Sequence, residues 1–187
     1  MLEDHAPEAF NAYLDMIYTG AVVRASPAYD HDDKDQHQTE DQAASRCFDL
    51  LVDTYILSTH LGDLQSCNTL SDRLIIESHI RGIYPSIVLA NKVWSCTPTK
   101  SPLRRLFVAF SVQDTEARSL RMLMDDPSPE SEFMRVVARR FSQVLKSYYV
   151  GEVLELRTFR MRRCAFHVHD GMLPVGEKCE EALELDT

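Results

Sequence analysis

Four residues of metal-binding type lie close together near the C-terminus. They are two cysteines and two histidines: Cys164, His167, His169 and Cys179. Zinc in proteins favours four such sulfur and nitrogen ligands arranged as a tetrahedron. The spacing Cys-x2-His-x-His-x9-Cys is not a familiar zinc pattern, and a His-x-His pair on extended chain points its rings to opposite sides. Two alternatives stay open: a zinc site, or a tail whose aromatic and imidazole groups pack on the rest of the protein.

The sequence offers weak support for catalysis. A nucleophilic Ser or Cys needs a base beside it in space. Ser58 and Ser78 have His60 and His79 as near neighbours in the sequence, but residues one or two apart on a helix do not face each other. The chain contains no G-x-S-x-G, H-E-x-x-H or P-loop motif. We therefore expect no catalytic residues and no enzymatic activity.

Composition argues against nucleotides and nucleic acids as main ligands. The formal net charge is -9 and the 187 residues include only 6 glycines. Phosphate binding needs clustered Lys and Arg, and close backbone approach to phosphates needs glycine. Four arginines do cluster before the Cys/His tail: Arg157, Arg160, Arg162 and Arg163. They leave an alternative open, in which the chain is a small zinc-binding or nucleic-acid-linked regulator that uses this tail.

The expected location is the cytoplasm or the nucleus. The five cysteines are odd in number and widely spread, which disfavours a disulfide framework. The first ten residues are acidic and lack the apolar core of a signal peptide. No apolar stretch approaches the roughly 20 residues that cross a bilayer, so we expect no membrane partner.

The positions of apolar residues predict a mainly α protein. Helical spacing and capping residues predict helices over residues 7–18, 46–61, 63–81, 84–97, 101–113 and 129–148. Residues 24–45 carry almost no large apolar side chains, so a disordered acidic linker is expected there. Its histidines, His31 and His37, lie among aspartates, and a solvated loop is favoured over a metal site. No internal repeat is visible.

Particular side chains can be assigned to the core from this spacing. Phe10, Leu14 and Ile17 form an apolar stripe on the first helix. Tyr55 and Leu74 are expected at the centre of an antiparallel hairpin made by helices 46–61 and 63–81. Trp94 is expected to join them from the following helix, and Cys67 and Cys96 are expected to be buried as small hydrophobic residues.

Several stretches of the chain resemble BTB/POZ domains. AFNAYLDMIYTG is similar to the helix that ends "LYTG" in that family, and LVDTYILSTHLGDLQSCNTLSDRLI is similar to the helical hairpin that follows it. The stretch TPTKSPLRRLFV resembles the "T-P-x-x-S-P-L-R-R-L" continuation of fungal BTB proteins, and CAFHVH resembles their "C-x-F/Y-H-x-H" segment. The likeness spans roughly residues 3 to 170.

The resemblance implies a fold and a function. It implies the helical C-terminal half of a fungal-type BTB/POZ domain plus following helices, with the strand-rich N-terminal portion missing. The expected parts are 1–23 (first helix and turn), 24–45 (linker), 46–97 (hairpin and next helix), 98–150 (helical extension) and 151–187 (poorly ordered tail). BTB domains are protein-interaction adaptors, so the implied partners are another BTB domain or a cullin-type ubiquitin ligase. No cofactor is implied, apart from the zinc alternative above.

Overall fold

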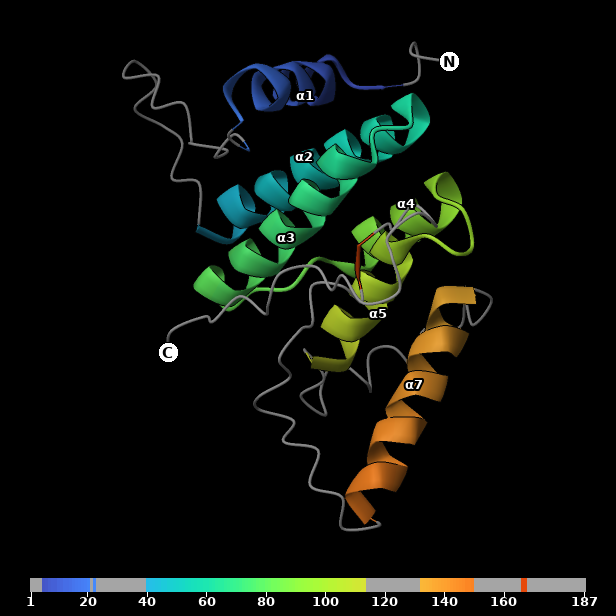
Figure 1. Ribbon diagram of the computed structural model, residues 1–187. Helices are drawn as coiled ribbons and strands as arrows, with labels where there is room; N and C mark the ends of the chain where they lie inside the picture. The colour runs from blue at the N-terminus through green and yellow to red at the C-terminus, as the bar shows by residue number, and fades with distance from the viewer. Residues whose placement is uncertain (1–4, 21, 23–39, 114–131, 150–165, 168–187) are drawn as a thin grey trace, which may run out of the picture.

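The described part of the protein is a bundle of α-helices. The computed structural model describes residues 5–20, 22, 40–113, 132–149 and 166–167. Six helices fall in these ranges, and no strand does: α1 (Pro7–Thr19), α2 (Glu40–Leu61), α3 (Leu64–Arg81), α4 (Ile87–Cys96), α5 (Pro102–Gln113) and α7 (Glu132–Tyr149). The mainly α class predicted from the sequence is confirmed (Figure 1). None of these helices has the length and hydropathy needed to span a bilayer.

Helix α1 has the predicted ends but not the predicted buried face. Pro7 occupies its first turn, and Gly20 ends it with a left-handed φ of 68° while donating its N–H to the Met16 carbonyl at 2.9 Å. The residues that α1 buries are Ala9 and Met16, whereas Phe10 and Ile17 are exposed. The expected stripe is therefore wrong for Phe10 and Ile17, while Leu14 is half-buried.

Helices α2 and α3 form the predicted hairpin (Figure 1). The turn between them contains Gly62, whose φ of 73° suits glycine, and Asp63, whose carboxylate accepts the Ser66 N–H and caps α3. However, α2 begins at Glu40 rather than at residue 46. Residues 40–45 therefore belong to the helix and not to the expected linker, because the Ala43-Ala44 pair favours helix and Ala44 is fully buried. Residues 24–39 lie outside the described ranges.

The later helices follow the predicted order, but α4 begins later than predicted. Helix α4 begins at Ile87, because the hydroxyl of Ser86 accepts the Leu89 N–H and caps it, so Tyr84 and Pro85 precede the helix instead of opening it. Helix α5 begins at Pro102 as predicted, with the Ser101 hydroxyl accepting the Leu103 N–H at 3.3 Å. The last predicted helix, over residues 129–148, corresponds to α7, which is described from Glu132 to Tyr149.

One hydrophobic core joins all six helices. Tyr55 and Leu74 are almost completely buried at its centre, and Trp94 is partly buried against it, as predicted. Cys67 is buried, but Cys96 is exposed in the last turn of α4, so its predicted burial is wrong. The reason is the register of α4, which turns Leu89, Ala90 and Val93 inward and Cys96 away from them.

Candidate functional site

A short piece of the tail is bound to the bundle. Phe166 belongs to the hydrophobic core, and His167 is buried beside it. The Nε2 atom of His167 lies 2.9 Å from the Oδ1 atom of Asp72 on α3. The two residues are 95 positions apart in the chain. The expectation of a poorly ordered tail over 151–187 is therefore wrong for Phe166 and His167, and the rest of that range lies outside the described residues.

The structure describes only one of the four predicted Cys and His metal ligands. Cys164, His169 and Cys179 lie outside the described residues, and only His167 can be placed. Because its Nε2 atom bonds Asp72, a zinc ion at this tail would have to bind His167 through Nδ1. Among the residues that the structure describes, no group of three or more His, Cys, Asp or Glu side chains is placed to hold a metal ion.

Arg104 is a buried charge that ties two helices together. It projects from α5, where its Nε atom donates to the Thr97 hydroxyl at 3.2 Å and its Nη2 atom donates to the Trp94 carbonyl at 2.5 Å. The same Nη2 atom also donates to the Thr97 carbonyl. These carbonyls end α4, where the helix leaves acceptors without intrahelical partners. A cation here also complements the negative end of the helix dipole.

Aromatic packing extends this arrangement to α7. The Arg104 guanidinium carbon lies 5.3 Å from the centre of the Trp94 ring, in the range of a cation–π contact. Trp94 also packs against Phe133 of α7, with ring centroids 4.7 Å apart. Arg104 also approaches the Glu132 carboxylate at 3.9 Å, although that carboxylate is exposed. The geometry suits a structural junction of α4, α5 and α7. In the sequence, Arg104 belongs to the S-P-L-R-R-L stretch that resembles fungal BTB proteins, but no structural role was predicted for it.

A second polar junction joins α1 to the hairpin turn. The Tyr13 hydroxyl donates to Asp63 Oδ2 at 3.1 Å, and the Ser66 hydroxyl donates to the same oxygen at 2.6 Å. Burial raises the pKa of Asp63, but the hydrogen bonds from Ser66 and Tyr13 lower it by more, so the net pKa lies below its ordinary value of 3.8. Asp63 therefore holds both the start of α3 and the side of α1.

The residues of possible nucleophilic type are engaged in packing contacts. The hydroxyls of Ser58 and Ser78 each donate to a carbonyl one turn earlier, of Thr54 and Leu74, at 2.8 Å. Neither hydroxyl therefore faces the histidine that follows it in the sequence. Burial raises the pKa of the Cys67 thiol, which disfavours the reactive thiolate.

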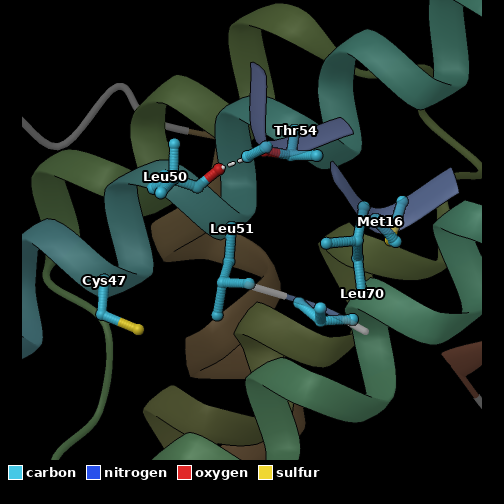
Figure 2. A pocket seen from close by; sticks show the side chains of 8 residues that line it. Met16, Cys47, Leu50, Leu51, Thr54 and Leu70 are labelled. Atoms are coloured by element: carbon cyan, nitrogen blue, oxygen red, sulfur yellow. Dashed lines mark hydrogen bonds between the residues drawn. The ribbon is translucent and has the colours of Figure 1, made fainter. Parts of the chain in front are cut away.

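The pocket between α1 and α2 is small and apolar. It is a gap of about 10 Å³ lined mainly by Met16, Cys47, Leu51 and Leu70 (Figure 2). The hydroxyl of Thr54 at its edge donates to the Leu50 carbonyl at 2.7 Å. A bound water needs about 10–15 Å³ and two to four polar partners, and ligand pockets measure roughly 300–1,000 Å³. This gap is a packing space at the α1–α2 contact rather than a binding site.

No protein-family model, curated protein or solved structure matches the chain. Its function must therefore be argued from the described surfaces and contacts.

The outer face of α1 exposes three large apolar side chains. Tyr18 is 83% exposed, Ile17 50% and Phe10 42%. These positions are seven and eight residues apart along α1, so they share one side of the helix. In Figure 1, α1 lies along the outside of the α2–α3 pair with its far side uncovered by any other labelled helix. We call Phe10, Ile17 and Tyr18 the α1 face.

Proposed function

We propose that the protein is a non-enzymatic protein-interaction adaptor that resembles the C-terminal helical half of a fungal-type BTB/POZ domain. Its partners would be another BTB domain or a cullin-type ubiquitin ligase, and the contact surface would be the α1 face. The exposure of three large apolar side chains on one helix carries the proposal. Contiguous apolar surface of this kind marks interaction sites in folded proteins.

The charges on α1 indicate what kind of partner fits. The helix contains Glu8 and Asp15 and no Lys, Arg or His. A helix with an apolar face and acidic edges fits a groove that is apolar at its centre and basic at its rim. The proposal therefore favours a partner with Lys or Arg beside the groove that receives Ile17 and Tyr18. Such a partner, and the odd number of cysteines, support the cytoplasm or nucleus as the location.

The proposal can be tested by direct titration with purified partners. The chain would be titrated by calorimetry with a cullin N-terminal domain and, separately, with a fungal BTB domain. Ile17→Asp should weaken binding at least tenfold, because a carboxylate would be desolvated at the centre of the contact. Val88→Asp is the matched control, because Val88 is 75% exposed on α4 and lies outside the α1 face.

The outcomes separate the proposal from its rivals. Binding by the wild type and by Val88→Asp, with loss in Ile17→Asp, supports it. Absence of binding to both purified partners, or equal binding by Ile17→Asp, contradicts it. Circular dichroism should show the same helix content for all three chains, because both substituted positions are exposed.

A zinc-binding tail, linked to a regulatory role, is the second candidate function. The observation that favours it is the His167–Asp72 pair, because zinc-binding histidines commonly bond a carboxylate through their other ring nitrogen. Zinc per chain would be measured on protein purified without chelator, with a Cys164→Ser, Cys179→Ser variant as control. A ratio near one in the wild type and near zero in the variant supports this function, and a ratio near zero in both excludes it.

A further inference from the structure

Two histidines from separate segments meet at the end of the hairpin. His5 precedes α1, and His60 lies in the last turn of α2. The Nε2 atom of His5 lies 2.7 Å from the Nδ1 atom of His60, and the ring centroids are 4.9 Å apart with an angle of 69° between the planes. His60 is exposed and His5 is half-buried, so solvent ions can reach the pair.

The two ring nitrogens are close to the separation that two ligands of one metal ion would have. Metal–imidazole bonds are about 2.0–2.1 Å long, so two nitrogens that bind one ion at right angles are about 2.9 Å apart, and at the tetrahedral angle about 3.4 Å apart. The observed 2.7 Å is a hydrogen-bond distance. To bind one ion, the rings must move slightly apart and turn so that both lone pairs point at the ion. Right angles between nitrogen ligands are typical of square-planar copper(II) and nickel(II).

We propose that His5 and His60 form a two-histidine site for a divalent transition metal ion with square-planar preference, copper(II) or nickel(II). The remaining coordination positions would be taken by water or by another small donor from solution. The inference is independent of the adaptor function, because it concerns the end of the hairpin and not the α1 face.

Metal binding by both histidines requires a particular tautomer of each ring. In the observed contact, one neutral imidazole donates its N–H to the lone pair of the other. For both nitrogens to bind the ion, each ring must carry its proton on the outer nitrogen, which is Nδ1 of His5 and Nε2 of His60. The ring that donates in the observed contact reaches this state by a change of tautomer.

A bound ion would fasten the start of α1 to the end of α2. In the described residues, the hydrogen bond of the Tyr13 hydroxyl to Asp63 already ties α1 to the hairpin turn. An ion at His5 and His60 would add a second tie close by. Because the ion binds only when both segments are in place, it would stabilise the folded arrangement of α1 on the hairpin.

The test is a titration of the full chain with nickel chloride alone in neutral buffer, followed by calorimetry. The wild type should bind nickel. His5→Gln and His60→Gln should each weaken binding at least tenfold, and the double variant should be no weaker than either single one. With nickel in about hundredfold excess over its Kd, the Tm of the wild type should rise by roughly 5–10 °C.

The control is His79→Gln, which removes an exposed histidine at the end of α3. It should bind nickel as the wild type does, and so should Cys164→Ser, which separates this site from a metal site in the tail. Copper(II) bound to the wild type should show an electron paramagnetic resonance spectrum with two nitrogen ligands. Wild-type affinity in either His5→Gln or His60→Gln, or an equal loss in His79→Gln, would overturn the proposal.

Discussion

At the scale of single residues, Arg104 and Arg105 show how one position on a helix decides the role of a side chain. Arg104 is buried and Arg105 is exposed, although they are neighbours in the same basic pair. The sequence contains a signal that distinguishes them. Arg104 precedes the buried residues Phe107 and Val108 by three and four positions, so it lies on the inner side of α5. The carbonyls that it meets belong to α4, and apolar spacing alone does not indicate them.

Replacing Arg104 should destabilise the whole protein. In Arg104→Ala, the carbonyls of Trp94 and Thr97 lose their charged donor, and hydrogen bonds to charged groups contribute about 1.5–3 kcal/mol each. Because the contacts share one side chain, we expect a loss of about 3 kcal/mol in the free energy of unfolding, measured by urea denaturation.

Arg105→Ala is the matched control for that measurement. Its side chain is exposed on the same helix turn, so the change should stay within about 0.5 kcal/mol of the wild type. Arg104→Lys should fall between the two, since one ammonium group cannot reproduce the planar fork of donors. An Arg104→Ala chain as stable as Arg105→Ala would show that the junction does not stabilise the fold.

At the scale of helices, ends were more predictable than faces. Gly20, Asp63 and Ser101 are of residue types that commonly stop or cap helices, and each occupies such a place in the structure. The buried face of α1 was not predictable from apolar spacing, because a helix with large apolar residues on two sides does not indicate which side the next helix covers. The structure buries the side that carries Ala9 and Met16.

The start of α2 was missed for a related reason. Residues 40–45 are polar apart from Ala43 and Ala44, so they carry little of the apolar pattern that predicts a helix. Ala44 is nevertheless fully buried. A short side chain at a close contact contributes to packing without contributing much to hydropathy.

Asp63→Ala should weaken the helix α3 cap in a pH-dependent way. Loss of an N-cap carboxylate costs about 0.5–2 kcal/mol, and loss of the Tyr13 bond adds to it. The pKa of Asp63 is lowered in the folded protein, so its contribution is present above the ordinary value and is lost as pH falls through the folded-state pKa. The difference between wild type and variant should be greatest near neutral pH and should shrink as the pH falls below 3.8, the ordinary pKa of Asp.

Urea denaturation at a series of pH values measures this difference. Asp15→Ala is a suitable control, because Asp15 is exposed on α1 and accepts the Thr19 hydroxyl through its backbone carbonyl, which the substitution keeps. Its effect on the free energy of unfolding should be small. A constant difference for Asp63→Ala would indicate that the carboxylate does not cap α3 in its charged form.

At the scale of the molecule, the helices fall into two groups within one core. Helices α1, α2 and α3 pack together, and α7 packs mainly against α5 and α4 (Figure 1). The hairpin could be predicted from sequence, because a two-residue turn between apolar helices leaves them little choice but to pack as antiparallel neighbours. The contact of His167 with Asp72 could not, since nothing local in either segment encodes a partner 95 residues away.

The two groups should differ in their response to a change at α7. Phe133 is almost completely buried against Trp94, and truncation of a buried Phe costs about 3–5 kcal/mol. Because Phe133 contacts the α4–α5 side, Phe133→Ala should speed amide hydrogen exchange throughout α7 while α2 and α3 keep most of their protection. Val136→Ala is the control on the same helix, since Val136 is exposed and its loss should leave exchange in α7 unchanged. Equal loss of protection in α7 and in the hairpin would mean that the six helices unfold as a single cooperative unit, with no separate step for α7.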